Sequence, residues 1–247
     1  KKLGGERDVV PGGVSIGLKP TDEELHEAVA GYLEDGYARV KLKIKPGRDV
    51  EMLAGLRERF PDTLFMADAN SAYRLEDSDR LREMDALNLT MIEQPLRYDD
   101  FLEHARLQER IETPVCLDES IKGEGDLALA LELGSCRIVN IKPGRVGGFG
   151  VSSRIHDTMR AAGLPVWCGG MLESGVGRAH NLALASLPGF TLPGDISASQ
   201  RYWSQDIVTP EFEVEDGVMK VPTGPGLGVE LDLDRIHGLT VREAEFG

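Results

Sequence analysis

The chain has 247 residues, with 28 Lys and Arg against 42 Asp and Glu and a formal net charge of −14. An acidic surface repels nucleic acids and anionic lipids, and no run of about 18 apolar residues is present to cross a membrane, so nucleic-acid and membrane partners are disfavoured. Cys116, Cys136 and Cys168 are widely separated and form no pairing pattern, which predicts a protein of the reducing cytoplasm.

Short apolar, β-branched segments recur along the chain, and their starts are 23 to 27 residues apart. They predict eight strands, at 14–18, 40–44, 65–68, 91–93, 115–118, 138–141, 165–168 and 190–192. Helical patterns fill the intervals at 21–32, 49–60, 77–87, 99–111, 124–133, 150–162 and 176–187. In the first helix, Leu25, Val29 and Tyr32 lie on one face, as in an amphipathic helix.

This alternation predicts parallel βαβ units, and eight units in about 250 residues predict an α/β fold of the (β/α)₈ TIM-barrel type over residues 14–202. A doubly wound open sheet is the alternative, but Gly12 and Gly13 precede the first strand rather than follow it, so the glycine-rich loop of such sheets is absent. Residues 203–247 form a tail outside the repeat. Within it, segments 212–214 and 218–221 predict a hairpin around an Asp216-Gly217 turn.

Ionisable residues occupy one equivalent position in five successive predicted strands. They are Lys43, Asp68, Glu93, Asp118 and Lys142, at spacings of 25, 25, 25 and 24 residues. Because the chemistry of such barrels takes place at the carboxyl ends of the strands, we expect these side chains to converge on one pocket. A single Asp at a strand end is more often a helix cap, but three carboxylates in register are difficult to explain in that way.

Three converging carboxylates repel one another unless a cation lies between them. Their oxygen atoms match the preference of Mg²⁺, and no His or Cys occupies the equivalent positions, which disfavours zinc. Lys41 shares a strand face with Lys43, and adjacent ammonium groups lower a lysine pKa towards that of a usable base. Arg145 is placed to act similarly on Lys142. Two lysines beside a metal-bound carboxylate suit removal of a proton from the neighbouring carbon.

Six further residues are weaker candidates for the same pocket: Ser15, Asn70, Glu119, Met171, Leu172 and Tyr202. Asn70 and Glu119 lie just past two of the acids. Glu119 either contacts the surroundings of the metal or Lys142, or it is a salt-bridged rim residue. The serine lies on the first strand, and the last three residues would form an apolar wall. Ordinary core packing is the alternative for each of these six.

Several segments carry familiar motifs: 40–44 (VKLKI), 68–70 (DAN), 92–95 (IEQP), 117–120 (LDES) and 140–148 (NIKPGRVGG). Together they resemble the enolase superfamily, and most closely its muconate-lactonising subgroup. Segments 165–175 (PVWCGGMLESG) and 192–195 (LPGD) are similar to the o-succinylbenzoate synthase and N-acylamino acid racemase family. The resemblance extends from about Val14 to Leu231.

The resemblance implies that Asp68, Glu93 and Asp118 bind Mg²⁺, for which Mn²⁺ or another divalent cation can substitute. It also implies an acid/base pair, Lys43 and Lys142, with the neighbouring Lys41 tuning the first of them. The pocket for a small-molecule carboxylate would be lined by the serine, methionine, leucine and tyrosine named above. The implied reactions are the dehydration catalysed by o-succinylbenzoate synthases in menaquinone biosynthesis and the racemisation of N-acylamino acids, and the motifs do not choose between them.

Members of this family carry a capping domain before the barrel. The resemblance implies that residues 1–13 are the end of the linker from such a domain, which is either lost or supplied by another chain, and that the tail packs on the barrel or on the cap. A homo-oligomer is one alternative for the assembly. Dipeptide epimerases and cycloisomerases are alternative functions, although the Asp-x-Asp of the epimerases is reduced here to Asp195-Ile196-Ser197. A Schiff-base aldolase and a catalytically impaired barrel are further alternatives.

Overall fold

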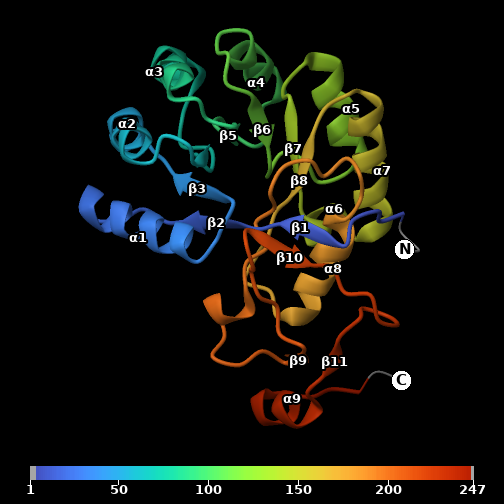
Figure 1. Cartoon of the computed structure of the whole chain (residues 1–247). Helices are drawn as coiled ribbons and strands as arrows, with labels where there is room; N and C mark the ends of the chain where they lie inside the picture. The colour runs from blue at the N-terminus through green and yellow to red at the C-terminus, as the bar shows by residue number, and fades with distance from the viewer. Residues whose placement is uncertain (1–3, 246–247) are drawn as a thin grey trace.

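The computed structural model describes residues 4–245, and within them seven parallel strands curl into one sheet in the sequential order β2 to β8 (Figure 1). The strands are β2 (Gly13–Ile16), β3 (Arg39–Lys43), β4 (Leu64–Asp68), β5 (Ile92–Glu93), β6 (Val115–Leu117), β7 (Ile138–Ile141) and β8 (Val166–Cys168). Helices surround this sheet in Figure 1, so the predicted α/β barrel architecture is confirmed.

The helices lie close to the ranges expected from the sequence. They are α1 (Asp22–Glu34), α2 (Val50–Arg59), α3 (Ser78–Glu83), α4 (Phe101–Gln108), α5 (Glu124–Leu133), α6 (Pro143–Val146), α7 (Phe149–Ala161) and α8 (Gly175–Ala185). The segment expected as one helix at 77–87 is broken into α3 between two 3₁₀ turns, η1 (Leu75–Asp77) and η2 (Met84–Leu87). In α1, the Thr21 side chain accepts a hydrogen bond from the Glu24 amide and so begins the helix, while Leu25 and Val29 are buried against the sheet.

The strand predicted at 190–192 does not form, which corrects the expectation of eight regular strands. Phe190 makes only an isolated parallel bridge to Val166. The physical reason is local, since Pro188-Gly189 and Pro193-Gly194 bound a segment of three residues. Proline cannot donate a ladder hydrogen bond, and glycine disfavours extended structure.

Arg39 helps to close the barrel where regular pairing is missing. Its guanidinium donates to the carbonyl oxygens of Val14 and Pro193, both at 3.1 Å, and so links β2 to the segment after Phe190. A single parallel bridge joins Gly12 to Gly194 beside it. Gly13 leaves room for this arrangement, because a Cβ atom there would collide with the guanidinium. Side-chain hydrogen bonds therefore replace part of a strand ladder.

Alternation along the strands separates an apolar exterior from a charged interior. In β3, Val40 and Leu42 belong to the main core between the sheet and the helices, whereas Lys41 and Lys43 lie on the other face. A second, smaller apolar cluster consists of Met66, Met91, Cys116, Ile138 and Trp167. The alternate positions of several strands thus form an interior that is apolar in one layer and ionisable in the next.

The tail pairs differently from the hairpin expected for it. The Asp216-Gly217 turn forms, with φ angles of 49° and 79°, but it is flanked by a single bridge between Glu215 and Val218. Strand β10 (Val218–Lys220) instead pairs antiparallel with β1 (Val9–Pro11). This pairing places Val10 opposite Met219, and both are buried, so burial of apolar surface favours it.

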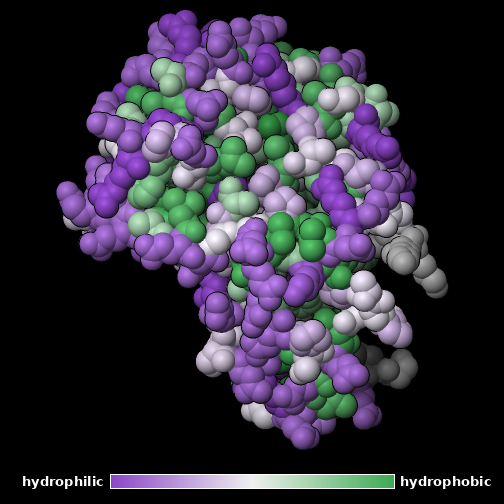
Figure 2. All heavy atoms as spheres, viewed as in Figure 1, coloured by the Kyte–Doolittle hydropathy of each residue, from purple (hydrophilic) through white to green (hydrophobic). Residues whose placement is uncertain are grey.

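The 3₁₀ turn η3 (Ser199–Arg201) precedes the tail, and the tail itself also contains β9 (Val208–Thr209), β11 (Glu230–Leu231) and α9 (Leu233–Leu239). Strands β9 and β11 pair antiparallel, and with α9 they form the lobe at the bottom of Figure 1. The face seen in Figure 2 is mostly hydrophilic, with apolar patches over the barrel and on this lobe. In the described part of the chain no helix is both long enough and apolar enough to cross a membrane.

His104 makes the stability of this fold dependent on pH. The ring is fully buried in α4, where Nε2 accepts from the Leu96 amide at 3.2 Å and Nδ1 lies 2.6 Å from the Asp100 carbonyl oxygen. Burial lowers the pKa of His104 below 6.5. The unfolded chain therefore binds a proton that the folded chain does not, and stability should fall as the pH drops below about 6.5.

We expect His104→Gln to remove this component of acid sensitivity. Thermal unfolding of both proteins between about pH 8 and pH 5 measures it, and the difference between their melting temperatures should shrink as the pH falls. A constant difference across this range would contradict the assignment.

Candidate active site

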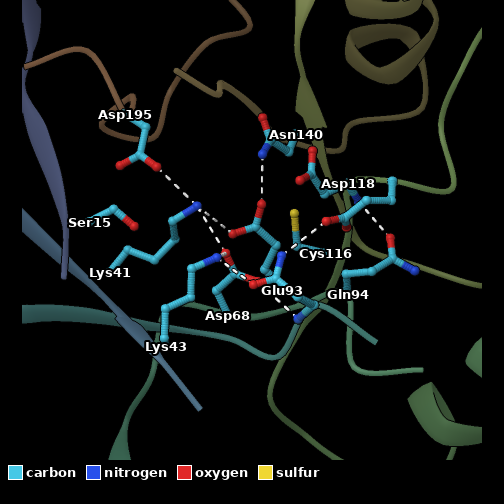
Figure 3. Close-up of polar contacts among 12 residues, drawn as sticks. Ser15, Lys41, Lys43, Asp68, Glu93, Gln94, Cys116, Asp118, Asn140 and Asp195 are labelled. Atoms are coloured by element: carbon cyan, nitrogen blue, oxygen red, sulfur yellow. Dashed lines mark hydrogen bonds and ion pairs between the residues drawn. The ribbon is translucent and has the colours of Figure 1, made fainter. Parts of the chain in front are cut away.

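The five ionisable residues that follow the sequence repeat lie at one end of the barrel (Figure 3). Lys43 is the register neighbour of Asp68, and Asp68 is the register neighbour of Glu93 on the next strand. Asp118 and Lys142 are the first residues after β6 and β7. The order around the barrel is therefore lysine, three acids and lysine, because parallel strands present their carboxyl ends at a common edge.

Lys41 lies at the centre of the acidic cluster. Its ammonium nitrogen is 2.9 Å from Glu93 Oε2, 2.9 Å from Asp195 Oδ2 and 3.2 Å from Asp68 Oδ2. The side chain is 5% exposed, and its nitrogen also lies 5.0 Å from the centroid of the Trp167 ring. Figure 3 shows Lys41 between Asp195 on one side and the strand-end acids on the other.

The acids around Lys41 favour its charged form. Burial would lower the pKa of Lys41, but Asp195, Glu93 and Asp68 outweigh burial and raise it well above its ordinary value. The expected lowering of a pKa within the Lys41–Lys43 pair therefore does not apply to Lys41. Burial raises the pKa of Glu93 to about 8, with Asp68 and Asp118 adding to the effect. Burial also opposes ionisation of Asp68, but Lys41 and Lys43 hold its pKa below the ordinary value.

Lys43 and Lys142 differ from Lys41 in exposure and in number of partners. Lys43 Nζ lies 2.6 Å from Asp68 Oδ2, and Lys142 Nζ lies 2.8 Å from Asp118 Oδ2. Their side chains are 32% and 15% exposed, and both line the same cavity. Each of these lysines therefore combines access to a ligand with contact to an acid of the cluster.

The donor set of Asp68, Glu93 and Asp118 fits a hard divalent cation, because it offers carboxylate oxygens on three adjacent strands and no sulfur or imidazole. Their arrangement is not that of a closed metal cage, since no group of three His, Cys, Asp or Glu side chains within residues 4–245 has metal-binding geometry. Asp68 and Asp118 instead accept hydrogen bonds from lysine ammonium groups. A cation bound to these acids would compete with Lys43 and Lys142 for the same oxygens.

Two buried amides that the sequence reasoning did not select hold the acids in place. Asn140 donates to Glu93 Oε1 at 2.6 Å. Gln94 accepts at Oε1 from the backbone amides of Asp118 and Ser120, at 3.0 and 3.2 Å. The Gln94 side chain is fully buried, and it fixes the next acidic strand end. The position of Gln94 directly after Glu93 is the sequence signal that could have identified it as a supporting residue.

Three further candidates surround the acids: Asn70, Glu119 and Arg145. Their hydrogen-bond partners differ in part from those expected from the sequence. Asn70 accepts from Lys43 and donates to Glu119 Oε1 at 2.9 Å, so it bridges the two sides of the rim. The second oxygen of Glu119 is buried without a described hydrogen-bond partner. Arg145 donates to Asp118 through both its carboxylate and its carbonyl oxygen, so the structure connects Arg145 to Lys142 through a shared acid.

The remaining candidates line a cavity of about 250 Å³ above the cluster: Ser15, Met171, Leu172 and Tyr202. Met171 and Leu172 are 63% and 71% exposed, so they lie at the rim rather than in a packed wall. A second cavity of about 500 Å³ adjoins the first and shares Lys142 and Met171 with it. Its lining also includes Pro143, His180 and Asn181.

Asp195, Arg39 and Arg201 also belong to the site, and the sequence reasoning did not select them. Asp195 pairs with Arg39 at 3.0 Å as well as with Lys41, and these cations hold its pKa below the ordinary value against the opposing effect of burial. Arg201 lines the cavity from η3. Asp195 lies 53 residues after Lys142, which is about two repeats, so extending the repeat past the irregular eighth strand would have identified it.

A family profile described as enolase C-terminal domain-like matches residues 24–235. The chain belongs to this family. The match covers most of the barrel and part of the tail, including every strand-end acid and lysine of the site.

Characterised relatives and solved structures are similar to the chain over nearly its whole length. An o-succinylbenzoate synthase from Geobacillus stearothermophilus is 54% identical over 238 residues, covering 96% of this chain and 64% of the relative. An N-succinylamino acid racemase from Thermus thermophilus is 53% identical, covering 97% of this chain and 65% of the relative. A solved enolase-superfamily protein from Listeria innocua has a TM-score of 0.93 at 48% identity, covering 96% and 64% of the two chains. The chain thus spans about two thirds of the length of these family members.

The buried network around Lys41 and Arg39 should be sensitive to the loss of one charge. Asp195→Asn keeps the shape of the side chain but leaves two buried cations each short of one carboxylate. Breaking a buried pair in this way costs about 3–5 kcal/mol, so we expect a loss of that size in the free energy of unfolding measured with urea. Asp79→Asn is the matched control, because Asp79 is 87% exposed and should contribute less than about 1 kcal/mol. Equal effects of the two substitutions would contradict the network.

Proposed function

We propose that this chain is the barrel part of a divalent-cation-dependent enzyme that removes the proton from the carbon next to a carboxylate. Its reaction is the dehydration of an o-succinylbenzoate synthase, the racemisation of an N-succinylamino acid, or both. The observation that carries the proposal is the placement of Lys43 and Lys142 on either side of three buried acids, facing one cavity.

The acids supply the binding site for the cation in this proposal. Asp68, Glu93 and Asp118 would hold Mg²⁺, which stabilises negative charge on the substrate carboxylate as the neighbouring carbon loses its proton. Lys41 neutralises the acids from within the barrel and is too well paired to accept a proton.

The two partly exposed lysines move the protons. In the dehydration, Lys43 takes the proton and then assists departure of water, while Lys142 remains a cation beside the developing anion. In the racemisation, Lys43 and Lys142 exchange protons on opposite faces of the same carbon. Gln94 and Arg145 support this chemistry, because they fix the backbone and carboxylate of Asp118.

The names of the relatives support the choice of reaction and substrate. The o-succinylbenzoate synthases and N-succinylamino acid racemases are 49–56% identical to this chain over their aligned residues, whereas an N-succinyl-L-Arg/Lys racemase from Bacillus cereus is 25% identical. The o-succinylbenzoate precursor and N-succinylamino acids both carry a succinyl group. We therefore propose succinyl-bearing carboxylates as the substrate class.

We also propose that a capping domain completes the pocket over the exposed side chains of Met171 and Leu172. These apolar residues rim the cavity, and enclosure would exclude water from the reacting carbon. A cytoplasmic location is part of the same proposal, and the three free, buried cysteines are consistent with a reducing compartment.

The proposal predicts exchange of the α-proton of N-succinylphenylalanine in D₂O. Proton NMR with Mg²⁺ should show loss of the α-proton signal, and EDTA should prevent it. Lys142→Ala should abolish racemisation of both enantiomers, with a loss of at least about 100-fold, because one of the two faces loses its acid/base group. Lys220→Ala, an exposed lysine on β10, is the matched control and should retain full activity.

Racemisation that survives in Lys142→Ala would refute the two-base assignment. If the chain alone exchanges no proton, the measurement is repeated with a capping domain from a relative added in trans. Absence of exchange in both cases would refute the proposed chemistry.

A separate prediction concerns the cation itself. Glu93→Gln keeps the size of the side chain but removes the negative charge that the most deeply buried acid can supply to a bound cation, so Mn²⁺ affinity measured by calorimetry should fall by at least about 10-fold. Glu76→Gln, at an exposed position in η1, is the control and should bind as the parent chain does. Unchanged affinity in Glu93→Gln would show that the cation binds elsewhere.

A further inference from the structure

Arg201 is a cation of the cavity that the proposed chemistry does not use. It ends η3 and lines the same cavity as Lys43 and Lys142. Its neighbours in that wall are Ser15, from β2, and Tyr202. The side chain is half-buried, so its guanidinium is both held by the protein and accessible from the cavity.

The guanidinium of Arg201 is held in place by aromatic rings and by one backbone acceptor. Its central carbon lies 5.1 Å from the centroid of the Tyr32 ring and 5.3 Å from that of the Tyr202 ring. One terminal nitrogen donates to the carbonyl oxygen of Ser15. Such stacking fixes the plane of the guanidinium and reduces the entropy lost when it binds a planar anion.

Arg201 differs from the other cations of the cavity in having no carboxylate partner among the described residues. Lys41, Lys43 and Lys142 each lie within 3.2 Å of at least one carboxylate oxygen. Across residues 4–245, no acidic side chain lies within ion-pairing distance of Arg201, and the Ser15 carbonyl is its one described hydrogen-bond acceptor. Because a guanidinium has five N–H donors, most of those on Arg201 remain available to a ligand.

The position of Arg201 places this positive charge away from the cluster of acids. The three strand-end acids lie on β4, β5 and after β6, whereas Arg201 contacts β2, and β3 with its two lysines lies between these regions in the sheet. Asp195 also lines the cavity, and its carboxylate is paired with Arg39 and Lys41. A ligand whose reacting carboxylate lies at the acids therefore meets Arg201 with a different part of its structure. The hydroxyl of Ser15 lines the same wall and is a further hydrogen-bond donor there.

We propose that Arg201 binds the second, distal carboxylate of a dicarboxylic substrate and so selects succinyl-bearing compounds over neutral acyl compounds. This inference rests on the proposed function for the placement of the first carboxylate. A planar guanidinium matches a carboxylate with two parallel hydrogen bonds, which a point charge such as a lysine ammonium cannot reproduce.

A structural role is the alternative for Arg201, and it makes a different prediction. Arg201 donates to the carbonyl oxygen of Ser15 much as Arg39 donates to that of Val14, the preceding residue of β2. If Arg201 served only to close the barrel, its loss would weaken the binding of all substrates alike. A role in recognition affects only ligands that carry the distal charge.

The test compares two ligands that differ only at the distal group: N-succinylphenylalanine and its N-succinamoyl analogue, in which an amide replaces the distal carboxylate. Calorimetric binding in the presence of Mg²⁺ should show that the parent chain prefers the succinyl compound by about 10- to 100-fold. Arg201→Gln should abolish this preference while the affinity for the succinamoyl compound stays constant. Arg201→Lys should recover only part of the preference, and Arg106→Gln, an exposed position on α4, should behave as the parent chain.

Kinetic measurement of α-proton exchange with the same two ligands adds a second readout. In Arg201→Gln, we expect the KM for the succinyl compound to rise by about 10- to 100-fold with little change in kcat. Equal losses on both ligands, or a preference that persists in Arg201→Gln, would overturn the inference. If the parent chain prefers the succinyl compound in calorimetry but exchanges no proton, either alone or with a capping domain added in trans, the proposed function fails while the assignment of Arg201 stands.

Discussion

The acidic end of the barrel interior depends on the positive charge of Lys41. Its ammonium nitrogen lies within 3.2 Å of oxygens from Asp68, Glu93 and Asp195, and it is almost completely buried. Carboxylates that are so close and so dry repel one another, and they would take up protons or separate without a cation among them. A lysine that enters from β3 supplies that charge from within the barrel. It therefore stabilises the fold at the place where ligand-binding acids would otherwise weaken it.

The same residue type serves two purposes in this site, and burial separates them. Lys41 contacts three carboxylates and is almost completely buried in the cavity wall, whereas Lys43 and Lys142 each contact one acid of the cluster and are more exposed to the cavity. Gln94 and Asn140 add a rigid frame, because their buried amides bind the strand ends and acids directly. Fixed acids and accessible lysines are what proton transfer at a single carbon requires.

The cavity has two positively charged regions, which in the proposed function face different parts of a substrate. Lys43 and Lys142 border the acids, and Arg201 lies beyond β3 on the side of β2. In that proposal the strand ends carry out the chemistry, and Arg201, in η3 after the last barrel strand, recognises the distal group. The reacting group and the distal group of a substrate are then read by independent elements, so reaction type and substrate choice can change separately.

The sequence by itself determined the barrel and the residues at its strand ends, because the repeat of about 25 residues and the two-residue period of strands are local properties. It failed for the strand at 190–192 and for the tail hairpin, where prolines and the burial of Val10 against Met219 decide the pairing. Only the tertiary structure decided the partners of the buried charges. Arg39 and Asp195 are 156 residues apart in sequence yet form an ion pair, and closure of the barrel is what brings them together.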